Sequence, residues 1–187
     1  MFVSRVLQAA ARTLITAPPS HISLPTVLLP TVLVPPVYKN EILKIYIDES
    51  FKEEGGKKNG GFGIFWEDDH PYNCCGMVPG PHLSPHRAEV YAALVAIRIA
   101  ILISAPKILL MSDSKYAKCG IEDEKYIEMS SIARDLLKSI HFMKRNVDVS
   151  VEKVKAHSGN YGNNRADKLA TKGRMEGHSD PNSLSFL

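Results

Sequence analysis

The sequence has little cysteine, a single tryptophan and almost no net charge. Its three cysteines among 187 residues show no C-x-x-C spacing, which excludes a disulfide framework and the usual kind of zinc site. Lys and Arg number 23 and Asp and Glu 20, so the formal net charge is only +3. That charge creates no strong overall field for a polyanion, and any nucleic acid would have to be held by local contacts. The 44% of apolar residues are enough for a folded core and argue against a wholly disordered chain.

Residues 1–41 differ in composition from the rest of the chain. They contain six of the 12 prolines and no acidic residue before Glu41. Because proline breaks helices, the apolar run 24–37 does not predict one membrane-spanning helix, and we expect no membrane partner. The first 17 residues are basic, hydroxylated and free of acids, which is typical of a mitochondrial transit peptide. A secretory signal and a disordered extension are the alternatives for this segment, and cytoplasm or nucleus are the alternative locations.

Residues 42–175 show the hydrophobic patterns of one α/β domain, and residues 176–187 are expected to form a flexible tail. The expected strands are 42–47, 62–66, 72–78, 107–111 and 147–154. The expected helices start at Ser84-Pro85 with an apolar stripe reaching Leu102, and then cover 114–120, 126–144 and 163–175. Residues 53–61 are charged and rich in glycine, which predicts a turn. This order predicts a five-stranded mixed sheet, its first three strands antiparallel, flanked by helices.

Three acidic residues lie where these elements meet one edge of the expected sheet. Asp48 ends the first strand, Asp113 ends the fourth, and Glu89 lies in the first turn of the first long helix. Carboxylates at the carboxyl ends of neighbouring strands converge on the edge where open α/β sheets bind ligands. Each has an ordinary explanation when taken singly, because Asp113 could cap a helix and Glu89 could interact with a helix dipole.

The segment KAHSGNYGNNRADKLATKG, residues 155–173, adds two further candidates. His157 follows a strand in a loop rich in Gly and Asn, and Asp167 lies ten residues later, in the last helix. Loops at the ends of strands commonly carry function. The alternatives are a loop histidine without a function and an Asp167 that simply pairs with Lys168 or Arg165.

Taken in series, these segments resemble the type 1 ribonuclease H family. The matching pieces follow the family's order: IYIDES around Asp48, HRAEVYAAL around Glu89, LLMSDSKYA around Asp113, and KAHSGNYGNNRAD with His157 and Asp167. The last piece is the most specific of the four. The resemblance runs from about residue 42 to residue 173 and implies a ribonuclease H-like fold.

The resemblance also implies an activity, namely hydrolysis of the RNA strand of RNA–DNA hybrids by an endonuclease that is largely independent of sequence. Asp48 would bridge two Mg²⁺ ions, which Mn²⁺ can replace, while Glu89 and Asp113 would hold one ion and Asp167 the other. Two such ions about 3.5–4 Å apart activate water and stabilise the departing oxygen, and Mg²⁺ prefers oxygen ligands. His157 would move a proton near the leaving group or help product release.

The partner implied is an RNA–DNA hybrid duplex, bound by a protein that we expect to be a monomer. A ribose 2′-hydroxyl is both donor and acceptor, so a site shaped around it distinguishes RNA from DNA. The residues expected to contact the hybrid are Ser50, Arg87, Ser114, Ser158 and Asn163.

Several positions depart from the family pattern. Glu49 stands where the family usually has Gly, Pro85-His86 replaces a polar pair, and Asn164 stands where an acidic residue is common. Residues 120–130 leave no room for the basic, tryptophan-bearing protrusion of many members, and we expect no separate hybrid-binding domain in residues 1–41. These departures support an alternative function: a catalytically weak or inactive ribonuclease H-like module that binds nucleic acid or serves assembly.

Overall fold

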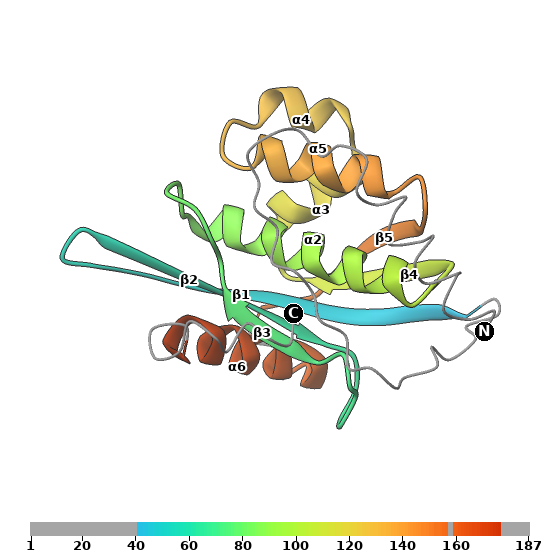
Figure 1. Cartoon of the computed structure of the whole chain (residues 1–187), viewed down its shortest axis with the longest axis horizontal. Coiled ribbons are helices and arrows are strands. Elements are labelled where there is room, and N and C mark those ends of the chain that lie inside the picture. Colours follow the sequence, from blue (N-terminus) through green and yellow to red (C-terminus); the bar gives the residue numbers. More distant parts are fainter. Residues whose placement is uncertain (1–40, 157–158, 177–187) are drawn as a thin grey trace, which may run out of the picture.

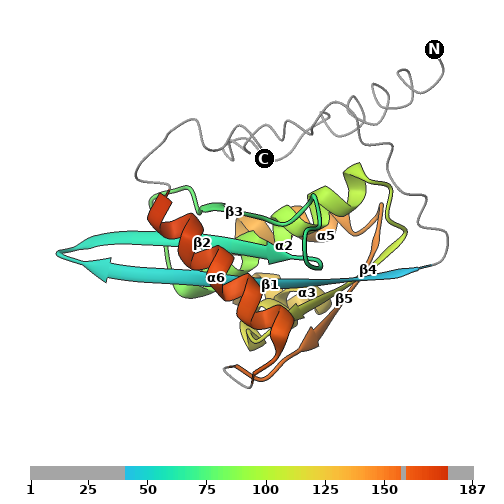
Figure 2. The same cartoon turned by 90° about the horizontal axis from the view of Figure 1, so that it is seen from below.

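The computed structural model describes residues 41–156 and 159–176, which form one sheet with helices on both faces (Figures 1 and 2). The strands are β1 (Ile42–Glu54), β2 (Lys57–Phe65), β3 (Cys74–Met77), β4 (Lys107–Ser112) and β5 (Asp148–Lys153). Their order in the five-stranded sheet is β3-β2-β1-β4-β5. β1 pairs antiparallel with β2, and β2 with β3, whereas β4 is parallel to both β1 and β5. The expected mixed sheet with three antiparallel strands is confirmed.

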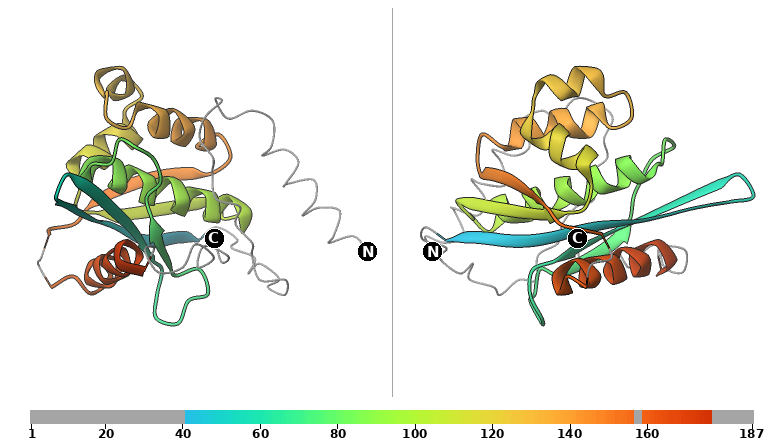
Figure 3. Two further views of the ribbon diagram at one scale, coloured as in Figure 1. Left: turned by 60° about the vertical axis from the view of Figure 1, so that its left-hand side comes forward. Right: turned by 180° about the vertical axis from the view of Figure 1, so that it is seen from behind.

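The helices form a layer on each face of this sheet. They are α2 (Pro85–Leu102), α3 (Lys115–Glu122), α4 (Lys125–Met129), α5 (Arg134–Met143) and α6 (Tyr161–Glu176). α2 to α5 lie on one face and α6 crosses the other, as the two views of Figure 3 show. Within the described ranges, no helix has both the length and the apolar character that a membrane span requires.

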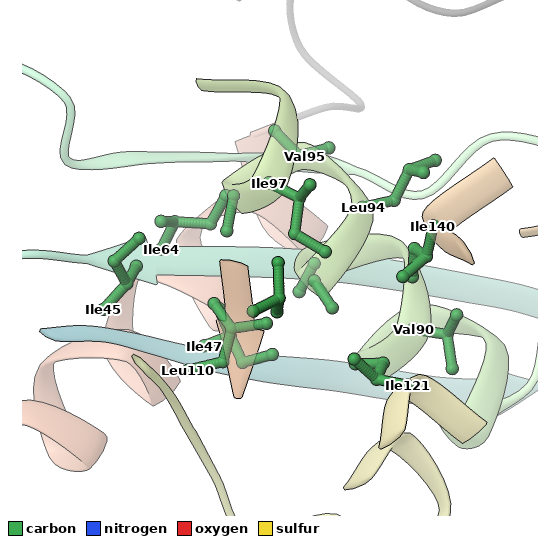
Figure 4. Packing of buried hydrophobic residues seen from close by; sticks show 14 of the residues in the cluster. Ile45, Ile47, Ile64, Val90, Leu94, Val95, Ile97, Leu110, Ile121 and Ile140 are labelled. Atoms are coloured by element: carbon green, nitrogen blue, oxygen red, sulfur yellow. The ribbon is translucent and has the colours of Figure 1, made fainter. Parts of the chain in front are cut away.

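Helix α2 supplies the centre of the core (Figure 4). It starts as predicted, with the Ser84 hydroxyl accepting the Arg87 N–H at 3.1 Å and Pro85 in the first turn. Because β1 and β2 lie below it and α5 above it, α2 is buried well beyond the predicted stripe. The largest fully buried side chains of the cluster come from the strands and from α2, α3 and α5: Phe62, Ile45, Ile47, Ile64, Leu94, Ile97, Ile108, Leu110, Ile121, Leu136, Leu137 and Ile140.

The prediction of a turn over residues 53–61 is wrong. β1 and β2 continue as a long hairpin, and its turn is confined to Gly55 and Gly56, whose φ angles are 57° and 78°. Two adjacent residues with positive φ make the tight turn that matches the twist of paired strands. Glu53 and Lys58 face each other across the hairpin, so opposite charges compensate for the absence of apolar residues.

The prediction of a single helix over residues 126–144 is also wrong, because residues 130–133 divide this segment into α4 and α5. The Ser130 hydroxyl bonds with the Tyr116 hydroxyl of α3, and its carbonyl accepts the Arg134 Nε–H at 3.0 Å. These contacts hold Ser130 outside a continuous helix. Ile132, expected on the buried face, is therefore 42% exposed, while Leu136 is buried as expected.

Helix α6 lies directly on the sheet because glycine lets its backbone approach β2. A Cβ atom on Gly63 would lie 2.1 Å from the Ala166 carbonyl oxygen and 2.4 Å from the Ala170 nitrogen. No side chain fits in that space, so the position requires glycine. The close approach holds the first half of α6 against the sheet at Asp48, the β1 residue paired with Gly63.

Candidate active site

The four carboxylates singled out in the sequence come from four elements that meet at one edge of the sheet. Asp48 does not end the first strand as expected: it lies in the middle of β1, which continues to Glu54 in the hairpin with β2. Glu89 lies in the first turns of α2, Asp113 directly after β4, and Asp167 in α6. Burial raises the pKa of Asp48 to about 7 against the lowering effect of the Glu49 N–H, and repulsion from Asp113 and Asp167 adds to the rise. The fold therefore brings Asp113 and Asp167 within electrostatic reach of Asp48.

Asp48 is held by one backbone and one side-chain donor. The Glu49 N–H donates to Asp48 Oδ1 at 2.9 Å, and the Asn163 side-chain amide donates to Asp48 Oδ2 at 3.4 Å. Asp48 and Asn163 are 8% and 5% exposed, respectively. The contact therefore joins the start of α6 to the middle of β1.

Glu89 is the most deeply buried of the four carboxylates. It is hydrogen-bonded to Ser112, a residue that was not among the candidates from the sequence. The Ser112 hydroxyl donates to Glu89 Oε1 at 2.5 Å and accepts the Ser114 N–H at 2.9 Å. Burial raises the pKa of Glu89 well above its ordinary value, and repulsion from Asp48 adds to the rise. Ser112 thus links α2 to the turn that carries Asp113. Its place as the last residue of β4 was the available signal.

The carboxylate and amide oxygens of this site are chemically suited to bind a divalent cation, but their present positions do not form a complete coordination shell. Two buried oxygens beside Asp48, Glu49 Oε2 and Asn163 Oδ1, have no hydrogen-bond partner within the described residues. A hard cation or its water shell would satisfy such oxygens. As the side chains stand, no three His, Cys, Asp or Glu residues of the described segments are grouped closely enough to hold one metal ion.

The residues expected to contact a hybrid fall into two groups. Asn163 adjoins Asp48, and Ser114 follows Asp113, although the Ser114 hydroxyl caps α3 by accepting the Ala117 N–H at 3.1 Å. By contrast, Ser50 and Arg87 are engaged within the protein: the Ser50 hydroxyl accepts the Arg174 Nε–H at 3.0 Å, and Arg87 pairs with Asp135. His157 and Ser158 lie outside the described residues.

Arg87 makes a two-pronged ion pair that joins α2 to α5. Its two terminal nitrogens donate to the two carboxylate oxygens of Asp135 at 2.6 and 2.7 Å, and the Arg87 side chain is only 15% exposed. The Arg87 guanidinium also lowers the pKa of Asp135 through this hydrogen bond. The geometry indicates that Arg87 contributes to the packing of two helices.

We expect Arg87→Met to lower the free energy of unfolding by about 1 kcal/mol, because it removes a bidentate pair that solvent partly screens on the Asp135 side. Urea unfolding of Arg87→Met, Asp135→Asn and the double variant measures the coupling between the two side chains. If the losses of unfolding free energy in the two single variants add up to the loss in the double variant, the two side chains are not coupled and this assignment is contradicted.

The departures at Pro85-His86 and at residues 120–130 have structural explanations. Pro85 begins α2, and the His86 ring stacks on Tyr116 at 4.7 Å with 7° between the ring planes. Between α3 and α5 the chain forms only the five-residue helix α4 in place of a protrusion. These segments therefore serve helix packing beside the acidic cluster.

A pocket of about 390 Å³ lies apart from the four carboxylates. Tyr46, Phe65 and Tyr161 line it, together with Asp68, whose carboxylate accepts the Tyr161 hydroxyl at 2.8 Å. None of the four carboxylates lines this space. The acidic cluster, and not this pocket, is therefore the candidate site.

Without divalent cations, we expect the melting temperature to fall as pH rises from about 4 to about 7. The pKa of Asp48 rises on folding from 3.8 to about 7, so the folded state keeps a proton that the unfolded chain loses in this range. The resulting stability is present in full below about pH 4 and is lost as pH passes the folded pKa. Asp48→Asn should flatten this slope in EDTA, whereas Asp148→Asn, at an exposed carboxylate, should not. Equal slopes in Asp48→Asn and wild type would contradict the expectation.

Comparison with known proteins identifies one family. The RNase H family model matches residues 40–175. Ribonuclease H1 of Mus musculus is 30% identical over 126 residues, which cover 62% of this chain and 44% of the mouse protein. The solution structure of the PFV RNase H domain aligns with a TM-score of 0.55 at 24% identity, over 70% of this chain and 93% of that domain. The foamy viral protease-reverse transcriptase in complex with RNA/DNA hybrid aligns with a TM-score of 0.53 at 22% identity, over 86% and 24% of the two chains.

These comparisons establish the fold of the chain, but they do not establish its activity. The structural matches confirm the ribonuclease H-like fold that the sequence resemblance implied. The chain spans less than half the length of the mouse relative, and the hybrid in the viral complex is bound to the viral protein.

Proposed function

The chain belongs to the RNase H family, whose model matches residues 40–175, and on that basis we propose that it is an endonuclease that hydrolyses the RNA strand of RNA–DNA hybrids. The observation that carries the proposal is the convergence of Asp48, Glu89, Asp113 and Asp167 at one edge of the sheet. Two of the four, Asp48 and Glu89, are buried carboxylates whose pKa values burial raises, and such perturbed groups concentrate at functional sites.

We assign the four carboxylates to a site for two Mg²⁺ ions, which Mn²⁺ can replace. Asp48 would contact both ions, Glu89 and Asp113 would hold one, and Asp167 the other. When bound, the ions supply a water of lowered pKa and a positive charge near the reacting phosphate. The chain's own contribution is to hold the ligands, because Ser112 orients Glu89 and Asn163 orients Asp48.

His157 is proposed to give a proton to the departing 3′ oxygen or to help product release. It belongs to the connection between β5 and α6, which returns to the described structure at Gly159. Histidine suits this role because its ordinary pKa allows both protonation states near neutral pH.

Recognition of the hybrid would depend on the sugar and phosphate groups, so that cleavage is largely independent of sequence. Ser114 and Asn163 are the better-supported contacts because they adjoin the cluster. Ser158 stays a proposal from the motif. To contact the hybrid, Ser50 would first have to leave its partner Arg174, and Arg87 would have to leave Asp135.

The proposal is tested with the full chain and a hybrid labelled on its RNA strand. We expect cleavage in Mg²⁺ or Mn²⁺, none in EDTA, and none of an all-DNA duplex of the same sequence. Absence of cleavage in both metals across the pH range in which the protein stays folded would overturn the proposal.

A binding module without catalysis is the second candidate. It is favoured by the lack of a closed three-ligand metal cage among the described side chains. Hybrid binding without turnover, unaffected by Asp48→Asn, would support this function, and metal-dependent turnover would exclude it.

We further propose that the protein acts as a monomer and that residues 1–41 direct it to mitochondria. Support for the second point is the basic, acid-free composition of the first 17 residues. Mass spectrometry of protein from isolated mitochondria should find an N-terminus downstream of Met1. Intact Met1 on protein found in the cytosol or nucleus would contradict the proposed targeting.

A further inference from the structure

Glu49, the residue that departs from the family pattern, stands next to Asp48 but points to the other face of the sheet. Asp48 is paired with Gly63, which contacts α6, whereas Glu49 is paired with Phe62. The Phe62 ring packs against Tyr91 of α2 with 5.4 Å between the ring centres. Because paired residues share a face, Glu49 lies on the side of α2, the helix that carries Glu89.

The strand register places Glu49 next to Asp113 as well as Asp48. Tyr46 of β1 is opposite Met111 of the parallel strand β4, so Asp113, two residues after Met111, follows β4 level with Asp48 and beside Glu49. Burial raises the pKa of Glu49 to about 7, and repulsion from Asp113 and Asp167 adds to the rise. Glu49 in turn contributes to the raised pKa values of Asp48 and Glu89. The departure therefore adds a fifth carboxylate to the cluster.

Nearby protein groups leave one Glu49 oxygen without a partner. Oε2 is buried and has no hydrogen bond among the described residues. Two of the lysines of the same hairpin are used elsewhere, since Lys52 pairs with Glu54 and Lys58 with Glu53. A buried, unpaired carboxylate oxygen is unfavourable unless a cation or a proton compensates it.

We propose that Glu49 is an additional ligand of the divalent cation site, acting together with Glu89 and Asp113, directly or through a bound water. The proposal rests on the proposed function, because it takes the cluster to be a metal site. Divalent-cation sites gain affinity with the number of their charged ligands. A fifth carboxylate would therefore raise cation affinity before any substrate phosphate arrives.

The test measures Mn²⁺ binding to the full chain, without nucleic acid, by isothermal titration calorimetry. Glu49→Gln keeps the shape and removes the charge, and we expect it to weaken Mn²⁺ binding about tenfold to a hundredfold. Glu49→Asp should retain more of the affinity. Glu53→Gln makes the same change on an exposed residue of the same strand and should bind as the wild type does.

Thermal unfolding supplies a second measurement that separates metal binding from a purely structural role. In EDTA, Glu49→Gln should melt above the wild type, because the substitution removes one negative charge from a group of neighbouring carboxylates. In Mn²⁺ it should gain less melting temperature than the wild type does. A higher melting temperature in EDTA with unchanged Mn²⁺ affinity would overturn the proposal.

The remaining outcomes distinguish this inference from the proposed function. Wild type that cleaves hybrid, with Glu49→Gln binding Mn²⁺ equally well, overturns only the role of Glu49. Wild type that binds Mn²⁺ in a Glu49-dependent manner without cleaving hybrid supports the inference and overturns the nuclease. Wild type that neither binds Mn²⁺ nor cleaves overturns both.

Discussion

Replacing Asp113 by asparagine is expected to eliminate hybrid cleavage while the fold stays intact. Asp113 follows the last residue of β4, is partly exposed, and raises the pKa of both Asp48 and Glu49 by repulsion. Asparagine has the same shape but cannot supply the charge that holds a divalent cation. We expect single-turnover cleavage in Mg²⁺ to slow by at least about a thousandfold, which corresponds to ~4 kcal/mol of transition-state stabilisation.

Asp148→Asn is the matched control for this experiment. Asp148 lies at the start of β5 and is paired in register with Lys107 at the opposite end of β4, where its side chain is 61% exposed. Its removal should leave cleavage and melting temperature close to those of the wild type. Cleavage by Asp113→Asn within about tenfold of the wild-type rate would show that the carboxylate cluster is not the catalytic centre.

Replacing Gly63 by alanine should give the largest loss of stability, about 3 kcal/mol or more. The new Cβ would lie 2.1 Å from the Ala166 carbonyl oxygen and 2.4 Å from the Ala170 nitrogen. Both are backbone atoms of α6, so no side-chain rotation relieves the contact and the helix must move away from β2. Urea unfolding measures the stability. A loss of hybrid cleavage should accompany it, because Asn163 and Asp167 move with α6.

Gly60→Ala tests whether the effect is specific to the helix contact. Gly60 lies in the same strand, and its Cβ would meet the Leu83 and Val78 side chains at 3.6 Å, an ordinary contact distance. We expect Gly60→Ala to shift the urea midpoint much less than Gly63→Ala. Equal midpoints for the two variants would show that α6 can move off the strand at little cost.

Local sequence patterns predicted most of the framework correctly. The Ser84-Pro85 start of α2 is confirmed, because a cap and a proline act within one turn. The alternation of Val147, Val149, Val151 and Val154 is confirmed by their burial. The pattern failed at residues 53–61, where charged cross-strand pairs replace apolar alternation, and at Ser130, where a bond to Tyr116 breaks a helix.

The low net charge carried little information about function, whereas the order of the strands and the positions of four acidic residues pointed to one edge of one sheet. Those features depend on local periodicity and on chain order, which a single sequence displays. Only the tertiary structure decided the partners of individual side chains: Arg87 pairs with Asp135, Ser112 holds Glu89, and Asn163 donates to Asp48. Each of these contacts joins elements that are distant in the chain, and packing of the whole domain sets the distances between them.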